Sequence, residues 1–319
     1  MAKLSRPRRG SLQYWPRKRA KSILPSVNWN NISSKNNDKK ILGFIGYKVG
    51  MMSAYVKDNT PDSMTKNKRV VFPVTIVECP PIKIFSARFY KNKLIIAEVL
   101  AGNLDKELIR TVKLPGKTYS KKIDDIKDYD DVRILVYSTV KRTGLKKSPD
   151  MTEVAIGGSL DDKIAFVKEH FGKELKINEV FEKLGLVDVH GVTKGKGLVG
   201  AVKRFGIGLK GHKSEKGRRR AGSLGPWHPA RVTFHAPQAG QLGMFSRVVY
   251  NNKILDIANI NEKNINPSSG FKQFGNIKTD YIILNGSVQG PAKRQMILTM
   301  PARKTKKQEK KNVELIELR

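Results

Sequence analysis

Three glycines in the second half of the chain have the spacing of a nucleotide-binding turn. Gly195, Gly197 and Gly200 read G-x-G-x-x-G, in which the backbone approaches a dinucleotide pyrophosphate at the start of a helix. That chemistry needs a helix after the glycines and an acidic residue about 20 positions later. Residues 199–205 are β-like instead, and Arg220 stands where the acid would be. The glycine pattern therefore does not predict a nicotinamide site.

Three histidines, His212, His228 and His235, fall in the same segment and would be the natural zinc ligands of this chain. They lack cysteine partners, because Cys79 is the only cysteine, and no helical pattern sets their spacing. Nucleophilic catalysis needs a base and a third group that orients it, whereas the only acid near these histidines is Glu215. We predict no catalytic residue, no metal site and no cofactor, so the chain is not expected to be an enzyme.

The segment around these residues is strongly basic. Residues 191–250 contain twelve lysines and arginines against Glu215 alone, so their net charge is 12 − 1 = +11. Such a density of positive charge repels itself unless a polyanion neutralises it. The many glycines prevent a long helix, yet they let the backbone come close to a partner. We predict an extended loop that depends on its partner for order.

The whole chain has the same character. Lys and Arg number 62 against 28 Asp and Glu, a formal charge of +34 over 319 residues, which makes nucleic acid the leading partner class.

No stretch approaches the roughly 20 apolar residues of a membrane-spanning helix, so a membrane partner is not expected. Pro7, Pro16 and Pro25 prevent the amphipathic helix of a transit peptide, so the N-terminus is interpreted as mature sequence. A single cysteine, Cys79, fits a reducing compartment.

Two terminal segments are predicted to be extensions. Residues 1–40 surround Tyr14 and Trp15 with arginines and lysines and show no apolar periodicity. Their aromatic rings could stack on unpaired bases while the charges hold phosphates, and a solvated tail is the alternative. Residues 304–319 form a second, C-terminal basic tail.

The loop from 206 to 245 has a geometry suited to folded RNA. As a hairpin its legs would reach at most ~70 Å, deeper than a compact domain can enter. Trp227 lies on this basic, glycine-rich segment, where we expect it to stack on a base or on the loop's own backbone. A small local cluster with Leu224 and Phe234 is the alternative for its indole.

The segments that must position this loop are mainly β. From Ile41 onward, short β-branched and aromatic runs alternate with Gly, Pro, Asn and Asp, which is typical of an antiparallel sheet or barrel. Gly43, Gly46 and Gly50 indicate bends or bulges in the first run. We assign a β-barrel core to 41–80 and 186–303.

Residues 81–185 are predicted to be an inserted α+β region. A helix is expected after Ser159, with Asp162 completing a capping box and Gly172 ending it, and 178–185 repeats the pattern more briefly. Residues 151–190 have five bases and eight acids, 5 − 8 = −3, so we expect them to face away from a polyanion.

Seven motifs follow one another along the chain: SRPRRGSL, PRKRAKS, ILGFIGYKVGMM, GVTKGKGLVGAVKRFG, GPWHPARV, PQAGQLGM and GSVQGPAKR. In residues and order they resemble those of a known family, the universal third protein of the large ribosomal subunit in its archaeal and eukaryotic form. The resemblance is strong over roughly 1–55 and 185–303, whereas 56–184 agrees only in the order of its elements.

This resemblance implies a translation-protein-type β-barrel with long basic extensions that penetrate ribosomal RNA. It implies that the loop approaches the peptidyl transferase region with Trp227 near its tip, and that Gln241 matches a glutamine methylated in some bacterial members. One residue departs from the pattern, because eukaryotic members have a histidine where Glu215 stands, three residues after His212.

The predicted function is that of a structural constituent of the large ribosomal subunit in the cytoplasm, which supports early subunit assembly and organises the peptidyl transferase region. Its expected partners are large-subunit rRNA and neighbouring ribosomal proteins, with no membrane, no homo-oligomer and no ion beyond structural Mg²⁺ from the rRNA. The residues expected to bind rRNA are Arg6, Arg8, Arg9, Trp15, Arg17, Lys18, Arg19, Lys194, Lys196, Lys203, Arg204, Lys210, His212, Lys213, Lys216, Arg218, Arg219, Arg220, Trp227, His228, Arg231, Gln241, Arg247, Lys293 and Arg294.

Two other classes of function stay open at this point. The glycine spacing at 195–200 allows an RNA-modifying or dinucleotide-dependent enzyme. Charge alone allows a DNA-compacting protein. Saturable cofactor binding by the purified protein would favour the enzyme. Preference for duplex DNA over folded rRNA in a competition experiment would favour the DNA-compacting protein.

Overall fold

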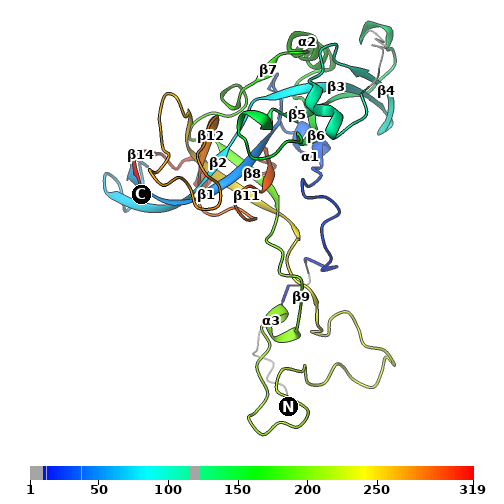
Figure 1. Ribbon diagram of the computed structural model, residues 1–319, viewed down its shortest axis with the longest axis vertical. Coiled ribbons are helices and arrows are strands. Elements are labelled where there is room, and N and C mark those ends of the chain that lie inside the picture. The colour runs from blue at the N-terminus through cyan, green and yellow to red at the C-terminus, as the bar shows by residue number, and fades with distance from the viewer. Residues whose placement is uncertain (1–9, 12, 37, 115–122) are drawn as a thin grey trace. The chain divides into compact units, whose positions relative to one another are not determined.

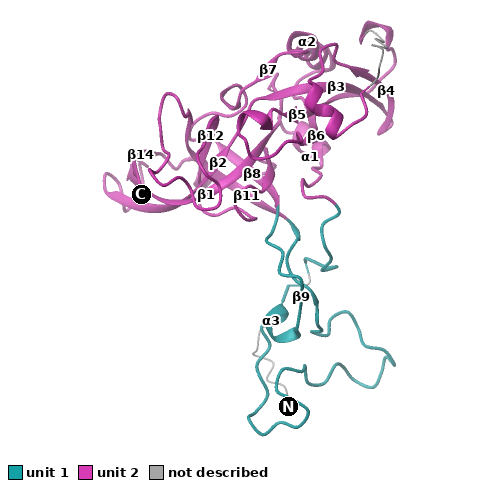
Figure 2. Ribbon diagram, viewed as in Figure 1, with its two compact units in different colours: residues 1–21, 192–246 teal, residues 22–191, 247–319 magenta. Residues whose placement is uncertain are grey.

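The protein is mainly β, as predicted, and its residues cluster into two compact units (Figures 1 and 2). One unit combines residues 1–21 with 192–246, and the other combines 22–191 with 247–319. The structure is a computed structural model. The residues that it describes are 10–11, 13–36, 38–114 and 123–319.

The larger unit is built on a seven-stranded sheet whose strands come from both ends of the chain. Its order is β13-β8-β11-β12-β2-β1-β14, and β13 pairs with β1 as well as with β8. The pairing therefore runs from β1 through β2, β12, β11, β8 and β13 back to β1. The strands are β1 (Gly43–Asp58), β2 (Arg69–Glu78), β8 (Leu186–Val192), β11 (Ser246–Asn259), β12 (Asp280–Asn285), β13 (Gln295–Thr299) and β14 (Val313–Leu318).

Strand β1 is the one that three others share. It pairs with β2 along most of its length, with β13 over its first residues from Gly43 to Tyr47, and with β14 over its last from Ala54 to Asp58. The register with β2 shifts between Lys48 and Gly50, which is the bulge that the glycines of this run predict. Gly43 has a second reason to be glycine, because a Cβ there would lie 2.6 Å from the Trp29 ring.

A second sheet is formed by the inserted segment. Its order is β4-β3-β5-β6, and a fifth strand, β7, pairs with β3. Helix α2 (Leu160–His170) contacts β5. The strands are β3 (Ile82–Lys91), β4 (Leu94–Leu100), β5 (Asp131–Ser138), β6 (Met151–Ala155) and β7 (Glu174–Leu175).

Helix α2 begins where the sequence predicts. The Ser159 side chain accepts a hydrogen bond from the Asp162 amide, and the Asp162 carboxylate accepts one from the Ser159 amide, so the capping box is complete. Gly172 follows the helix end with a φ of 76°, a conformation that glycine adopts without strain. The remaining helices are short: α1 (Trp29–Ser33), η1 (Lys106–Arg110), η2 (Ile123–Asp125), η3 (Val140–Arg142), η4 (Ile177–Glu179), α3 (Ala201–Phe205) and α4 (Lys306–Glu309).

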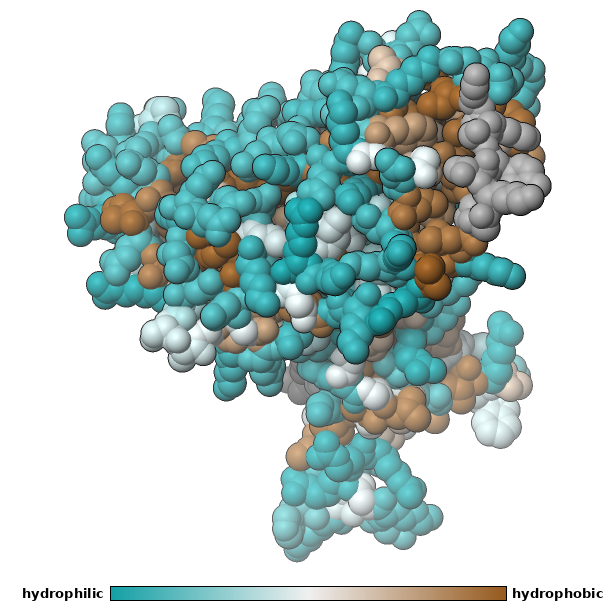
Figure 3. All heavy atoms as spheres, turned by 45° about the horizontal axis from the view of Figure 1, so that its top comes forward, coloured by the Kyte–Doolittle hydropathy of each residue, from teal (hydrophilic) through white to brown (hydrophobic). Residues whose placement is uncertain are grey.

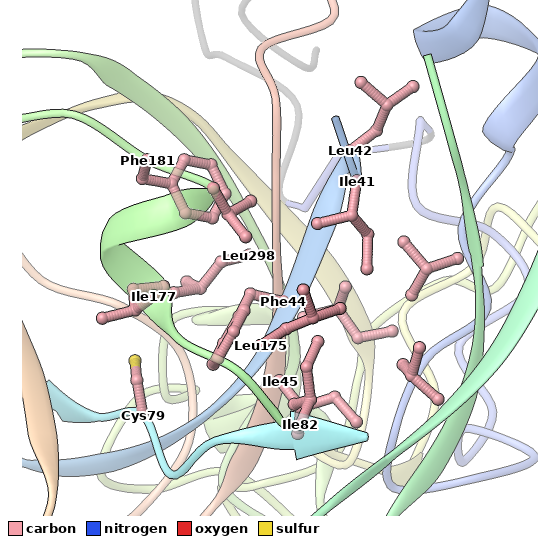
Figure 4. Packing of buried hydrophobic residues seen from close by; sticks show 14 of the residues in the cluster. Ile41, Leu42, Phe44, Ile45, Cys79, Ile82, Leu175, Ile177, Phe181 and Leu298 are labelled. Carbon is pink, nitrogen blue, oxygen red and sulfur yellow. The ribbon is translucent and has the colours of Figure 1, made fainter. Parts of the chain in front are cut away.

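One hydrophobic core joins the two sheets of the larger unit. Phe44 and Ile45 of β1 and Leu298 of β13 pack in one cluster with Ile82 of β3 and with Leu175 (Figure 4). All five side chains are almost fully buried. Burial of each such side chain is worth roughly 1.5–3 kcal/mol, so the inserted sheet and the first sheet stabilise each other.

Three segments differ from their sequence predictions. Residues 29–33 are not part of an arm, because they form α1 and bury Trp29 and Ile32 in the core. The second helix expected over 178–185 is only the single 3-10 turn Ile177–Glu179. Residues 304–319 contain α4 and also β14, which pairs with β1.

Stability should depend on pH through His190 of β8. Burial lowers the pKa of His190 to about 4, and its Nε2 lies 3.2 Å from the Thr299 hydroxyl. The unfolded chain binds the proton near pH 6.5, so His190 destabilises the fold as the pH falls from there towards 4. For one proton, the free energy of unfolding can fall by at most about 1.4 kcal/mol per pH unit. Urea unfolding should show that His190→Gln removes this pH-dependent loss of stability. Equal pH slopes for the variant and the parent would contradict the assignment.

Candidate nucleic-acid interface

The two legs of the basic loop are joined by backbone hydrogen bonds. Thr193 donates to Phe245 O at 3.0 Å, Lys196 donates to Leu242 O at 3.0 Å, and Leu242 donates to Gly197 O at 2.9 Å. Strands β9 (Leu198–Val199) and β10 (Gly240–Gln241) extend this pairing. We call residues 193–200 and 239–245 the neck of the loop. The neck fixes where the legs start without burying much apolar surface.

Arg204 ties the neck to the N-terminal segment. Its Nε donates to Gln241 O at 3.0 Å, its Nη1 to Gln238 O at 3.1 Å, and its Nη2 to Arg17 O at 3.4 Å. Burial lowers the pKa of this guanidinium. Arg204 was predicted to bind rRNA, whereas in the structure its guanidinium organises the protein's own backbone.

Helix α3, which carries Arg204, corrects the prediction that 199–205 is β-like. Its five residues, Ala201–Phe205, begin after Gly200, and Gly206 ends it with a φ of 65°. Ala201 and Phe205 are buried, so the apolar residues at i and i+4 of one helical face were the missed signal. The glycine pattern therefore does precede a helix, but Arg220 still replaces the acid that binds a ribose.

An aromatic cluster surrounds Phe205. The Trp15 ring is stacked on Phe205 at 6.2 Å between centroids and meets Phe234 edge-on at 5.3 Å. The guanidinium carbon of Arg17 lies 4.4 Å from the Phe205 centroid, and the Trp15 indole donates to Ser11 O at 2.8 Å. Trp15 and Arg17 thus pack against other residues of this unit. The sequence-based prediction for both was a contact with RNA.

Beyond the neck, the loop is exposed and basic. Residues 207–239 contain no helix or strand, and Lys210 and Arg218 are joined across a turn by two hydrogen bonds, from the Lys210 amide to Arg218 O and from Arg218 Nε to Lys210 O. The three consecutive arginines 218–220 are exposed, and no carboxylate in the described part of the chain forms an ion pair with them. A surface of exposed guanidinium groups without carboxylate partners is suited to phosphate.

Trp227 is the most exposed aromatic side chain of the loop, with 88% of its surface accessible. It lines an open hollow of about 340 Å³ together with Leu224 and Pro226. Phe234 does not join it, because that ring packs on Trp15. The alternative of a local cluster with Leu224 and Phe234 is therefore wrong for Phe234, and the indole face is open to a partner.

The Gln241 side chain is turned back on the neck. Its Nε2 donates to Leu242 O at 3.2 Å and to Gly243 O at 3.0 Å. A methyl group on this nitrogen would remove one of its two hydrogens, so one of these two bonds would be lost.

The three loop histidines form no metal site. His212 and His228 are exposed, and the His235 ring lies 4.0 Å from the Phe234 ring. Within the described residues, no group of three or more His, Cys, Asp or Glu side chains is placed to hold a metal ion. Among the described residues, no helix is long and apolar enough to cross a membrane.

The structure places the remaining predicted residues as follows. Arg6, Arg8 and Arg9 lie outside the described residues. Lys293 and Arg294 belong to the other unit, where the Lys293 amide donates to Lys48 O at 2.8 Å and burial lowers the pKa of Arg294. Those half-buried are Trp15, Arg17, Arg204, Lys210, Gln241, Arg247 and Arg294. Those exposed are Lys18, Arg19, Lys194, Lys196, Lys203, His212, Lys213, Lys216, Arg218, Arg219, Arg220, Trp227, His228, Arg231 and Lys293.

An exposed basic loop with open aromatic and guanidinium groups, on a mainly β scaffold, defines a nucleic-acid-binding protein. Comparison with known families makes this specific. The family model described as ribosomal protein L3 matches residues 1–319, and the chain belongs to that family. It is therefore a structural protein of the ribosome and not an enzyme, as predicted.

Relatives from several archaea are similar over almost the whole chain. The large ribosomal subunit protein uL3 of Methanocaldococcus jannaschii is 43% identical over 309 residues, which cover 92% of this chain and 91% of that protein. The protein of the same name from Methanobrevibacter smithii is 40% identical over 326 residues, covering 97% and 95%. That from Archaeoglobus fulgidus is 40% identical over 307 residues, covering 92% and 90%.

The neck should fail when Gly243 gains a side chain. Its φ is 78°, and a Cβ there would lie 1.9 Å from the Lys194 carbonyl oxygen, so that oxygen must move. We expect Gly243→Ala to raise hydrogen exchange at the amides of Lys196 and Leu242 by at least tenfold, because a positive φ and a backbone clash each cost about 1 kcal/mol or more. Gly208→Ala is the control, since nothing lies within 4 Å of a Cβ at Gly208. Unchanged exchange in Gly243→Ala would refute this account of the neck.

Proposed function

We propose that the chain is a constituent of the large ribosomal subunit that binds large-subunit rRNA through the loop 206–245 and its neck. The observation that carries the proposal is the surface of the loop, where exposed arginines and lysines have a single acid, Glu215, among them. The relatives named above are large-subunit proteins, which supports this partner. The chain would then reside in the cytoplasm with that subunit, help early assembly and organise the peptidyl transferase region.

The loop would bind by neutralising phosphates along its legs. Lys194, Lys196 and Lys203 lie at or beside the neck, whereas Lys213 and the arginines 218–220 lie far along the loop, so contacts would be distributed over its length. Each lysine or arginine that meets a phosphate releases condensed counterions, which drives binding at low salt. Arg204 has another part in this scheme, because it fixes the legs from which the other cations project.

Trp227 would provide the base contact at the end of the loop. Its open indole face and the shallow hollow beside Leu224 and Pro226 suit a single unpaired base. In this proposal Trp15 contributes indirectly, since its ring supports Phe205 and Phe234. Gln241 would contribute to rRNA binding indirectly, because its side chain holds the backbone of the neck by hydrogen bonds. Mass spectrometry would show whether Gln241 is methylated.

The first sheet would be a closed β-barrel of the translation-protein type. Its pairing circuit from β1 back to β1 supports closure, since a barrel is a sheet whose first and last strands pair. The proposed division of the chain is a barrel core in 41–80 and 186–303, an inserted α+β region in 81–185, and basic extensions in 1–28 and 304–312, with α1 and β14 joined to the larger unit. The membership of β3 to β7 in a separate sheet supports the inserted region.

The proposed partners are rRNA and adjoining ribosomal proteins, with the chain present as one copy and not as a homo-oligomer. Structural Mg²⁺ would come with the rRNA. The acid-rich residues 151–190, which include α2, would face away from phosphate. The alternatives of an RNA-modifying enzyme and of a DNA-compacting protein are not supported, because the whole chain matches a ribosomal family.

Binding to rRNA should be steeply salt-dependent. With about ten phosphate contacts, the affinity of the full chain for transcribed large-subunit rRNA should fall by three to five orders of magnitude between 50 and 200 mM salt. The variant Arg218→Gln, Arg219→Gln, Arg220→Gln should reduce the slope of log K against log salt by roughly 2 to 3. A flat titration of the parent protein would rule out the electrostatic mechanism.

Removing the loop should leave the larger unit folded. Replacing residues 208–237 by a short Gly-Ser linker keeps the neck and α3, and these residues contribute nothing to the two main hydrophobic cores of the larger unit. The urea midpoint should therefore stay within experimental error, while rRNA affinity falls at least a hundredfold and incorporation into large subunits drops. A loss of cooperative unfolding would contradict the proposed separation of scaffold and loop.

A further inference from the structure

A hollow in the larger unit lies far along the chain from the basic loop. It has a volume of about 830 Å³ and lies between the β1–β2 turn and α4. Its apolar lining comes from the chain near Pro61 and from Val70 and Phe72 of β2. Its cationic lining comes from Lys307, Lys310 and Lys311 of α4 and the residues after it. Figure 1 shows the β1–β2 turn beside β14 and the C-terminus.

Hydrogen bonds fix the two walls of this hollow to each other. The Asn59 amide donates to Asn312 O at 3.0 Å, and the Asn312 amide donates to the Thr60 hydroxyl at 3.0 Å. Within the turn, the Asp58 carboxylate accepts hydrogen bonds from Ser63 at 2.7 Å and from Thr65 at 2.5 Å. These hydroxyl donors, with that of Thr60 first, hold the pKa of Asp58 well below its usual range. The hollow is therefore preformed.

Its lysines are not held in ion pairs by the carboxylates of the described residues. The Lys311 ammonium lies 4.1 Å from the centroid of Phe72, and burial lowers its pKa. Asp58 is the carboxylate that attracts it, but the Asp58 oxygens already accept bonds from the turn. None of Lys307, Lys310 and Lys311 forms an ion pair with a carboxylate in the described part of the chain. Residues 303–311 have six bases and one acid, 6 − 1 = +5.

The occupant must be anionic, with an apolar part, and of limited size. Asp62 is the one other acid in the lining, and its side chain is exposed to solvent. The volume is in the range of pockets that enclose small ligands, about 300–1,000 Å³, whereas a protein partner spreads over a surface of about 800 Å². One or two nucleotides satisfy all three conditions. A ribose and base can lie against Pro61 and Val70 while the phosphate meets the Lys311 ammonium.

We propose that this hollow binds single-stranded nucleotides of large-subunit rRNA, with Lys307, Lys310 and Lys311 on their phosphates and Pro61, Val70 and the Phe72 edge against base and ribose. It is an RNA site separate from the loop 206–245 and its neck. This inference rests on the proposed function, because it takes rRNA as the partner of the chain. It gives the scaffold itself an RNA contact.

The test compares two triple variants of the full chain that remove the same charge. Lys307→Gln, Lys310→Gln, Lys311→Gln should lower the salt slope of binding to large-subunit rRNA by about 2, since single strands release ~0.7 ions per contact. The control, Lys106→Gln, Lys127→Gln, Lys173→Gln, changes exposed lysines of the inserted region and should leave the slope unchanged. Equal slopes for both variants and the parent would overturn the site.

Crosslinking by ultraviolet light in isolated large subunits, followed by mass spectrometry, provides the second readout. Nucleotide adducts on peptides that contain 58–72 or 307–311 are the expected result. Protein crosslinks from these lysines to a neighbouring chain, without nucleotide adducts, would show a protein partner and overturn the proposal. If the hollow variant keeps its slope while the variant at 218–220 loses slope, only this inference fails. A flat titration of the parent protein would instead refute the proposed function.

Discussion

The order of the basic loop depends on backbone hydrogen bonds, because apolar burial cannot supply it. A segment with a net charge of +11 has few residues to bury, and like charges drive its legs apart. The neck opposes this with paired strands and with Arg204, whose planar guanidinium donates to several carbonyl oxygens at once. A lysine could not make this fork. The fixed neck lets the remainder of the loop stay adaptable to its partner.

The scaffold has the opposite character. Its two sheets share a single core, so the inserted region is not an independent appendage of the first sheet. Ion pairs are concentrated there as well: Glu153 meets both Arg88 and Arg133, and Lys163 of α2 meets Asp131. Figure 3 shows hydrophilic residues over most of the face in view. Acids thus accompany bases where the scaffold packs on itself, whereas the exposed arginines 218–220 form no ion pair with a carboxylate of the described residues.

Much of the scaffold could be predicted because its signals are local. Alternating β-branched runs gave the strands from β1 to β5, and the Ser159 and Asp162 pair gave the start of α2. The basic loop could be predicted from charge alone, and the motifs identified the family. Other features are visible in retrospect, such as the i, i+3 pair Trp29 and Ile32 of α1 and the alternating VELIEL of β14.

What could not be predicted depends on contacts between distant residues. Nothing near Arg204 in the sequence shows that its guanidinium binds the carbonyl of Gln241, or that Trp15 packs on Phe234. From composition alone, every arginine of a basic segment is predicted to bind phosphate, because positive charge is the only property of the side chain that the local sequence shows. The structure separates those that hold the loop together from those that remain open, and only three-dimensional placement can do so.

The pairing of β1 with β13 has a consequence for synthesis of the chain. Gly43 lies opposite Thr299, so 299 − 43 = 256 residues separate the two partners. During translation the first edge of β1 must wait unpaired while the inserted region and the whole basic loop emerge. Contacts of such long sequence separation form slowly, and an exposed strand edge beside unneutralised positive charge invites aggregation and nonspecific RNA binding. The first sheet can therefore complete its pairing only after residue 299 has been synthesised, so the amino-terminal strand is the last to gain all its partners.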